Sequence, residues 1–261
     1  MLEYFFYSLI LLNIFFIFYL KKRKIRVFFH NPKIKSVNLE DVSECFNPDI
    51  VDDKLKSPSE RMITSIFFVP ETWNVVGMTS DYEAWILSVL SKKSKNIFEF
   101  GTCSGKTTFL FSLNSPDDAK IYTITLDPSS IGHATKISGE STVAQKNALS
   151  ESKYNKFMFS KNNNIKSKIE VIFQDSKKLN IDRFVDSLDL IFIDGGHSYS
   201  CVKNDTEKSM RMIRKNGLIF WHDYSIGKRS HKDVYKYLNE IRDKYEIFHI
   251  RNTSLCFYKK Q

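Results

Sequence analysis

The residues best suited to chemistry lie in one turn, Glu99-Phe100-Gly101-Thr102-Cys103-Ser104-Gly105. An apolar, strand-like run ends in this turn, and a helical pattern starts directly after it. Gly101 has no side chain, so the backbone can come close to a ligand, and Gly105 permits the turn into a helix whose first amide groups point at that ligand. The turn therefore predicts a site for a nucleotide-type cofactor. An ordinary tight turn with no ligand is the alternative.

The number of residues between the glycines excludes two other kinds of nucleotide-binding turn. A phosphate-cradling P-loop has four residues between its first Gly and the Gly-Lys pair, but only three residues separate Gly101 from Gly105. A dinucleotide turn of the Gly-x-Gly-x-x-Gly type requires glycine where Cys103 stands. The spacing Glu-x-Gly-x-x-x-Gly instead resembles the first motif of class I S-adenosylmethionine-dependent methyltransferases.

The elements that must position this turn alternate between helix and strand. A helix with an N-cap pair, Ser80 and Glu83, precedes the first strand. Two strand-like runs near the end, 245–251 and 254–258, are close enough for a hairpin and too close for a helical crossover. The fold class is therefore α/β, a doubly wound, Rossmann-like, mostly parallel sheet with a terminal antiparallel hairpin strand. Strands are predicted over 97–100, 120–126, 168–173, 188–193 and 218–221.

Acidic side chains recur at the ends of these strands. Ligands of doubly wound sheets bind beyond the carboxyl ends of the strands, so we expect these side chains to meet in one crevice. Each of them, taken singly, has the alternative of an ordinary loop or capping residue. The five are Glu99, Asp127, Asp175, Asp194 and Asp223.

The resemblance covers about residues 79–258 and implies how the cofactor S-adenosylmethionine is held. It implies that Asp127 accepts two hydrogen bonds from the ribose hydroxyls, which suits the paired acceptors of a carboxylate. It places Glu99 near the methionine part, and Asp175 with Ser176 near the adenine. Further contacts are implied for the turn residues Gly101, Thr102, Cys103 and Gly105.

Two later motifs, Asp194-Gly195-Gly196-His197 and Trp221-His222-Asp223-Tyr224, resemble those of metal-assisted sugar and small-molecule O-methyltransferases of the macrocin-methyltransferase type. That resemblance implies that Asp194 and Asp223 hold a divalent cation against two substrate oxygens and that His197 is the base. A hydroxyl has a pKa far above neutral, so a cation and a positioned imidazole would help to form the attacking alkoxide. A loop histidine that orders the turn is the alternative for His197.

Position 222 departs from the pattern, because the macrocin type tends to have an acidic residue there. A His222 ligand would shift the preference from Mg²⁺ toward Mn²⁺, since hard Mg²⁺ prefers oxygen. Adjacent residues of an extended strand point to opposite sides, so His222 packing away from Asp223 is the alternative. The metal candidates are Asp194, His222 and Asp223, while His133, His231 and His249 are expected to be surface or packing residues.

Composition limits the remaining possibilities. The chain of 261 residues, 42% of them hydrophobic, has room for one α/β domain of about 200 residues plus an extra segment. The formal net charge of +9 includes a basic run at 21–26 beside an apolar stretch, and no base-flipping motif follows the fourth strand. No nucleic-acid partner is therefore expected. Four scattered cysteines indicate a reducing compartment.

The first residues predict a membrane anchor. Residues 2–20 are almost wholly Leu, Ile, Phe and Tyr, a helix length of roughly 30 Å that is just enough to cross a bilayer. Glu3 precedes this stretch and the basic run follows it, unlike a cleavable signal peptide. We expect a single-pass transmembrane helix at 1–20, a basic juxtamembrane segment and linker at 21–59, and a methyltransferase domain at 60–261 that faces the cytosol. A buried or interfacial helix is the alternative.

The expected function is an S-adenosylmethionine-dependent O-methyltransferase for a hydroxyl of a sugar, glycan precursor or related small molecule. An insertion at 129–166 and the loops after the fourth and fifth strands are expected to shape the acceptor pocket. A non-catalytic, membrane-anchored binding or scaffold protein of the same fold is the alternative, against which Asp194, His197 and Asp223 argue together.

Overall fold

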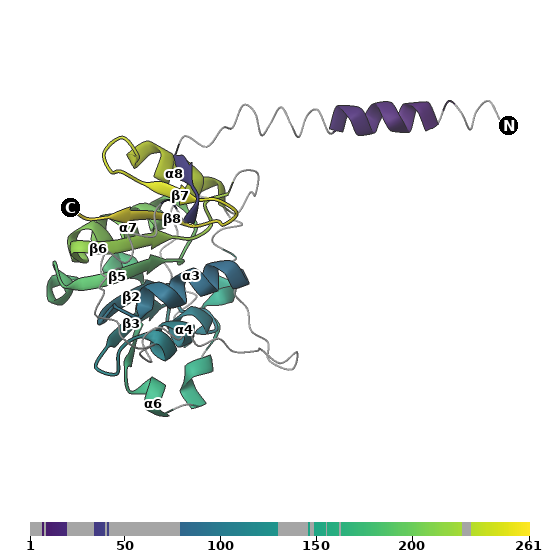
Figure 1. Cartoon of the computed structure of the whole chain (residues 1–261). Coiled ribbons are helices and arrows are strands. Elements are labelled where there is room, and N and C mark those ends of the chain that lie inside the picture. The colour runs from purple at the N-terminus through teal and green to yellow at the C-terminus, as the bar shows by residue number, and fades with distance from the viewer. Residues whose placement is uncertain are drawn as a thin grey trace, which may run out of the picture. The chain divides into compact units, whose positions relative to one another are not determined.

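The computed structural model describes residues 7, 9–19, 34–39, 41, 79–129, 146, 149–154, 156–161, 163–225 and 231–261. The chain divides into two units, Met1–Lys33 and Ile34–Gln261. Residues 9–19 of the first unit are helical. The second unit is a sheet with helices on both faces (Figure 1).

The sheet of the described part of the second unit confirms the expected topology. Its strand order is β1-β7-β8-β6-β5-β2-β3-β4. All pairings are parallel except those of β8, which runs antiparallel to both β6 and β7. The strands are β1 Lys35–Val37, β2 Asn96–Phe100, β3 Lys120–Thr125, β4 Ile169–Phe173, β5 Leu188–Ile193, β6 Ile213–Trp221, β7 Phe248–Ile250 and β8 Cys256–Lys259.

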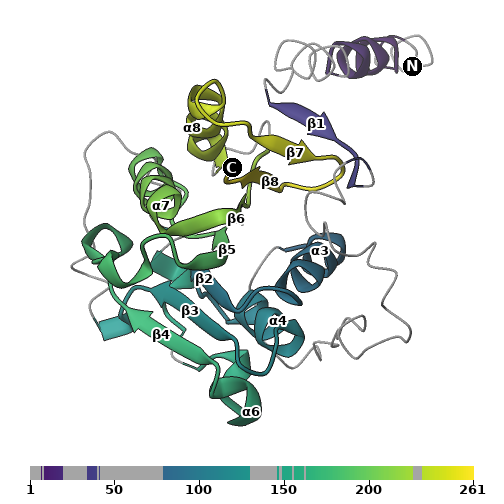
Figure 2. The same cartoon turned by 60° about the vertical axis from the view of Figure 1, so that its left-hand side comes forward.

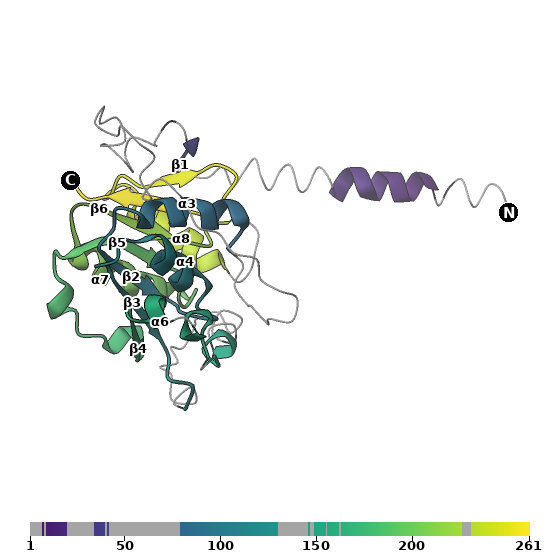
Figure 3. The same ribbon diagram turned by 60° about the horizontal axis from the view of Figure 1, so that its bottom comes forward.

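Four longer helices cover the two faces of the sheet. Helices α3 and α4 contact each other on one side, and α7 and α8 contact each other on the other side (Figures 2 and 3). These helices are α3 Asp81–Ser91, α4 Lys106–Asn114, α7 Tyr199–Met212 and α8 Lys232–Ile241. Shorter helical segments are η3 Met158–Lys161, α6 Asn163–Lys166, η4 Ser176–Lys178 and η5 Asp182–Phe184.

Strand β2 shows why both faces are covered. Its side chains alternate, so Ile97 packs with α3 and α4 while Phe98 and Phe100 pack with α7 and α8. All three are fully buried, and each contributes about 1.5–3 kcal/mol of hydrophobic stabilisation. The alternation turns Glu99, which lies between them, toward α3 and α4.

The structure differs from the sequence expectations at three elements. Residues 35–37, expected in the linker, form edge strand β1, a segment too short to show periodicity. Helix α7 ends at Met212 and β6 starts at Ile213, whereas the strand was expected to start at residue 218. Helix α8 was not expected at all, although its apolar residues lie on one face.

The expected transmembrane helix is described only at residue 7 and residues 9–19. Within the part of the chain that the structure describes, no helix has the length and apolar character needed to cross a membrane. The other residues of the predicted anchor, and most of the predicted linker at 21–59, lie outside the described residues, as does much of the insertion at 129–166.

Candidate active site

The glycine turn joins the ends of three strands. The amide of Gly101 donates to Ile124 O over 3.0 Å, and the amide of Asp194 donates to Phe100 O over 2.9 Å. Gly101 has φ 99°, and a Cβ there would lie 2.1 Å from Asp194 O. Glycine is therefore required where β2 passes β5. Gly105, with φ 80°, is the N-cap of α4.

A cavity opens beside this turn, at the carboxyl ends of β2 to β5, as expected for the cofactor. Of the predicted cofactor residues, Gly101, Cys103, Asp175 and Ser176 line it. The remaining lining residues are Phe100, Ile124, Thr125, Leu126, Glu151, Ser152, Gln174, Asp194, Gly195, Gly196, Cys201 and Asp205.

Glu99 does not line the cavity. Its buried carboxylate lies under α4, where it accepts hydrogen bonds from Thr108 Oγ1 and, over 2.7 Å, from Thr123 Oγ1. Thr123 also shares a 2.6 Å hydrogen bond with the hydroxyl of Thr102. Burial raises the pKa of Glu99 to about 8, although the two threonine hydrogen bonds oppose the shift. Glu99 thus stabilises the turn from beneath, and its contact with the cofactor stays a prediction.

Asp127 also lies outside the lining residues. Its carboxylate is at the surface and accepts hydrogen bonds from the amide of Ser129 over 2.9 Å and from its hydroxyl over 2.8 Å. These hydrogen bonds lower the pKa of Asp127. The cavity reaches the adjacent residue, Leu126. The ribose contact of Asp127 stays a prediction, as do the contacts assigned to Thr102 and Gly105.

Four predicted catalytic and metal residues meet at the end of the cavity. Oδ1 of Asp194 lies 3.1 Å from Nδ1 of His222 and 3.9 Å from Nε2 of His197. Oδ2 of Asp223 lies 2.9 Å from Nε2 of His197, and its Oδ1 lies 3.4 Å from Nδ1 of His222. Two carboxylates and two imidazoles from the ends of β5 and β6 therefore form one cluster.

The backbone at Asp223 explains why His222 and Asp223 act on the same cluster. Neighbours in a regular strand would point to opposite sides, but Asp223 has φ 62°. Meanwhile the amide of His222 still donates to Ile193 O over 3.1 Å, so β6 stays paired up to this residue. The sharp change of direction turns the Asp223 carboxylate back toward His222.

Contacts between charged groups outweigh burial in shifting the pKa values of the cluster. Burial alone would lower the pKa of His197, but its contacts with Asp194 and Asp223 outweigh burial and raise this pKa to about 10. The pKa of His222 is raised in the same way, against burial, mainly by the charge of Asp194. Burial would raise the pKa values of Asp194 and Asp223, but the histidines hold both below their ordinary values.

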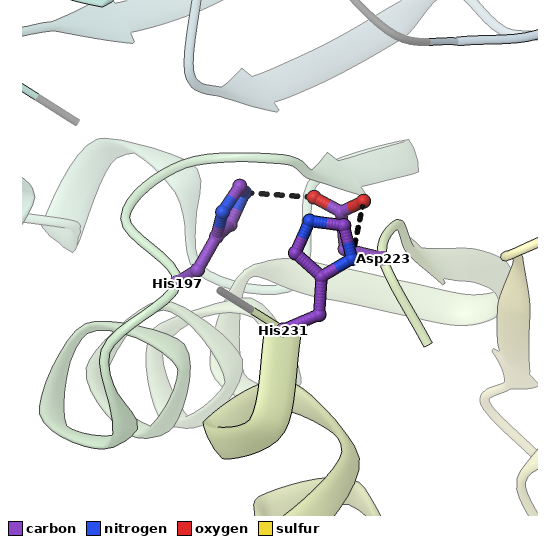
Figure 4. Close-up of side chains that lie close together, drawn as sticks. All are labelled: His197, Asp223 and His231. Carbon is purple, nitrogen blue, oxygen red and sulfur yellow. Dashed lines mark ion pairs between the residues drawn. The ribbon is translucent and has the colours of Figure 1, made fainter. Parts of the chain in front are cut away.

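Sequence reasoning missed His231, which was expected at the surface or in packing. It stands just before α8, and its Nδ1 lies 3.2 Å from Oδ1 of Asp223 and 3.1 Å from the hydroxyl of Ser225. Figure 4 shows Asp223 paired with both His197 and His231. The ring centroids of the two histidines are 5.2 Å apart. Because α8 was not predicted, no sequence pattern placed His231 here.

Two acidic residues were also missed. Glu151, from the insertion, and Asp205, from α7, both line the cavity. The insertion is held over the glycine turn by the amide of Met158, which donates to Ser104 O over 3.0 Å. Burial raises the pKa of Asp205 to about 6. Neither residue follows a strand, so the strand-end rule did not find them.

The donor atoms of the cluster fit a cation. One ligand atom each from Asp194, His222 and Asp223 lie within 4.8 Å of one another. The same spacing holds for His197, Asp223 and His231, so Asp223 belongs to both groups. Carboxylate oxygens and neutral imidazole nitrogens are ordinary ligands of divalent metals.

Comparisons with known proteins identify the kind of domain that contains this cluster. Residues 98–224 match a family model described as a methyltransferase domain. The matched segment runs from β2 to the residue after Asp223, and so contains the glycine turn and the cluster. No match exists among curated proteins.

Several solved structures resemble this chain at low sequence identity. A putative caffeoyl-CoA O-methyltransferase from Staphylococcus aureus has 19% identity and a TM-score of 0.49, over 71% of this chain and 86% of that one. The O-methyltransferase TomG from Streptomyces achromogenes, solved with S-adenosylmethionine, has 11% identity and a TM-score of 0.44, over 91% and 96%. An O-methyltransferase from Bacillus cereus, solved with SAH, has 13% identity and a TM-score of 0.43, over 69% and 82%. These similarities concern the fold, and they assign no residue a role.

The sheet topology, the glycine turn beside a cavity and the family match define a Rossmann-like methyltransferase domain. Over residues 98–224 the chain therefore carries a methyltransferase domain, and its sheet has the topology expected of class I methyltransferases.

Proposed function

We propose that the enzyme transfers the methyl group of S-adenosylmethionine to a hydroxyl of a sugar, a glycan precursor or a related small molecule, assisted by a divalent cation. One observation carries this proposal. Asp194 lines the cofactor cavity, and the same carboxylate contacts His222 and lies 3.9 Å from His197 Nε2. A methyl donor bound in this cavity would therefore be adjacent to the acid–base groups.

His197 is the group we assign to remove the hydroxyl proton. Asp223 orients the His197 ring through the 2.9 Å contact at Nε2. The side chain of His197 is only 12% exposed, which limits competition from water for its ring nitrogens. A base must be neutral, whereas the two carboxylates hold His197 protonated near neutral pH. Base catalysis by His197 therefore requires another positive charge beside Asp194 and Asp223.

Asp194, His222 and Asp223 are the residues that would hold a cation. When bound, it would polarise the acceptor oxygen and offset the two carboxylate charges. A donor set with one imidazole suits Mn²⁺ better than Mg²⁺. The chain's own contribution is to fix the directions of these three side chains from the ends of β5 and β6.

The test follows labelled methyl transfer by the full-length protein. Acceptors are matched pairs of sugars that carry a hydroxyl or an amine at the same position, assayed with chelator and after adding back Mn²⁺ or Mg²⁺. We expect transfer to the hydroxyl series, loss with chelator, and recovery with Mn²⁺. Transfer confined to amines would refute the acceptor class, and indifference to chelator would refute the cation. Cofactor binding without transfer to any acceptor would favour the non-catalytic binding protein.

We also propose that the segment at 1–20 anchors the enzyme to a membrane, with the catalytic domain facing the cytosol. Support comes from its composition, from the basic run that follows, and from the exposed apolar side chains of the helical residues, such as Leu11 at 66% and Phe15 at 72%. Flotation with lipid vesicles tests the proposal. The full chain is expected to float with the vesicles, and a chain that begins at Ile34 is expected to stay behind.

A further inference from the structure

The carboxylate of Glu83 makes more contacts than its helix cap requires. Glu83 caps α3 by accepting hydrogen bonds at Oε2 from the amide and the hydroxyl of Ser80, each over 2.9 Å. Its other oxygen, Oε1, accepts from the amide of Ser254 over 2.6 Å and from its hydroxyl over 2.8 Å. Oε2 also lies 3.4 Å from Nε2 of His222. One buried carboxylate therefore joins the start of α3, the loop between β7 and β8, and the catalytic cluster.

These contacts leave His222 in one orientation. Nε2 faces Glu83, and the opposite nitrogen, Nδ1, faces Asp194 and Asp223 at 3.1 Å and 3.4 Å. The side chains of His222 and Glu83 are only 4% and 5% exposed, so water does not compete for either nitrogen. Phe192 packs against the ring with the centroids 6.0 Å apart.

We propose that Glu83 is a positioning residue that keeps a proton on Nε2 of His222 and thereby directs Nδ1 at the cation site. A carboxylate accepts hydrogen bonds and donates none, so it keeps hydrogen on the ring nitrogen that faces it. Glu83 therefore holds a proton on Nε2, while a cation beside Asp194 and Asp223 would take the place of the proton on Nδ1. Histidine ligands of metals commonly donate their second N–H to such a carboxylate, which fixes the ring and makes it a better ligand. The part of the inference that concerns the cation rests on the proposed function, while the ring form of His222 does not.

Glu83 and Ser254 both lie outside residues 98–224, the part that matches the methyltransferase family model. The amide of Tyr224 also donates to Ser254 O over 2.9 Å, so the loop that holds Glu83 is tied to the end of β6. The contacts that position His222 therefore come from helix α3 and from the β7–β8 hairpin, which lie outside the matched domain.

The decisive variant is Glu83→Gln in the full-length protein. A side-chain amide has one acceptor oxygen, so it cannot replace both carboxylate oxygens. The two short hydrogen bonds from Ser254 are expected to hold the amide oxygen at the position of Oε1. The amide NH₂ then faces His222 and donates to Nε2, which must be without hydrogen to accept. Ser80→Ala is the matched control, because it removes a cap hydroxyl, at a cost of about 1 kcal/mol, but leaves Glu83 facing His222.

Nitrogen NMR of the histidine rings, in protein freed of metal by chelator, reads the ring form directly. We expect hydrogen on Nε2 of His222 in the wild type and in Ser80→Ala, and its loss in Glu83→Gln, with little change at His249. A wild-type His222 without a proton on Nε2 would overturn the proposal even if Glu83→Gln failed to fold. Equal spectra for wild type and Glu83→Gln would overturn it too.

Mn²⁺ binding, followed by electron paramagnetic resonance, gives the second measurement. We expect Glu83→Gln to weaken binding about 10–100-fold and Ser80→Ala to leave it within about twofold. Asp194→Ala separates the two proposals. If Asp194→Ala leaves Mn²⁺ binding unchanged, the cation site itself fails, and the NMR result still decides the role of Glu83. Binding lost with Asp194→Ala but unaffected by Glu83→Gln would refute the effect on the cation.

Discussion

Nε2 of His197 lies 2.9 Å from Oδ2 of Asp223, although the two residues follow different strands of the sheet. The pair is formed because β5 and β6 are parallel neighbours, with Ile193 opposite Trp221. Their carboxyl ends therefore meet at the cofactor cavity, where acid–base chemistry is useful.

His197→Ala is expected to lower turnover by about 10²–10⁴-fold, the usual contribution of a general base, while cofactor binding changes little. Cofactor affinity by titration calorimetry and labelled methyl transfer separate the two effects. His249→Gln is the control, because His249 bonds to Ser36 and Thr253 in the β1–β7 region. Turnover that survives in His197→Ala would remove His197 from the mechanism.

Glu151→Gln is expected to weaken S-adenosylmethionine by roughly fivefold and S-adenosylhomocysteine far less. In the proposed mode of binding the methyl group would face the cluster, so the cationic sulfur would lie at the end of the cavity where Glu151 interacts with the charges of His197, Asp194 and Asp223. The demethylated product is neutral at sulfur. Titration calorimetry at pH 8 measures the affinities of wild type and Glu151→Gln for both ligands, and so the ratio of the two losses.

Asp175→Asn is the matched control for Glu151→Gln, since it lines the same cavity and was assigned to the adenine that both ligands share. It should weaken both ligands equally. An equal loss for both ligands in Glu151→Gln would mean that Glu151 does not act through the charge on sulfur.

Gly101→Ala is expected to destabilise the fold by at least about 3 kcal/mol, because the added methyl collides with the backbone and the φ is unfavourable for alanine. The nearest atom, Asp194 O, would lie at 2.1 Å. Gly195→Ala is the milder control, since its nearest atom is the side-chain Oδ2 of Asp205 at 3.3 Å. Urea unfolding of both variants gives the comparison, and similar losses would contradict it.

The variant Glu99→Gln tests whether the buried carboxyl of Glu99 makes the free energy of unfolding depend on pH. The folded pKa of Glu99, about 8, is above its ordinary value of 4.5, so its stabilising effect is complete below pH 4.5. As the pH rises from 4.5 to 8, the unfolded chain loses this proton first, and the free energy of unfolding falls by up to about 1.4 kcal/mol per pH unit.

The amide of Glu99→Gln cannot ionise, so the variant should gain stability relative to wild type as the pH rises through this window. Urea titrations at pH 5, 6, 7 and 8 measure the difference. Glu170→Gln, at a surface carboxylate paired with Arg183, serves as control. Parallel curves for Glu99→Gln and wild type would show that Glu99 ionises normally.

Removing β1 is expected to destabilise the catalytic unit. A chain beginning at residue 57 lacks the strand that pairs with β7 and the buried side chains of Ile34 and Val37, together worth about 3–6 kcal/mol. A chain beginning at Ile34 keeps them. Thermal unfolding of the two shortened chains should show a clearly lower Tm for the shorter one, and equal values would make β1 dispensable.

The local sequence was sufficient to predict the parallel sheet, the final antiparallel strand, the glycine turn and the α3 cap. Each depends on residues close together in the chain: alternation within a strand, two glycines at a fixed spacing, or Ser80 and Glu83 three positions apart. The carboxyl-end rule also predicted that Asp194 and Asp223 would meet, because parallel neighbours bring their ends to one edge of the sheet. His197 was added to them by the resemblance to metal-assisted O-methyltransferases.

Tertiary structure alone decided the partners of these residues. Glu99 follows the pleat of β2 under α4 rather than into the cavity, and a positive φ at Asp223 brings it back to the side of His222. His231, directly before α8, and Glu83, in α3 and held by Ser254 of the β7–β8 loop, reach the cluster from distant parts of the chain. Spacing in a sequence carries no information about such contacts, because helix packing and a single backbone angle determine them.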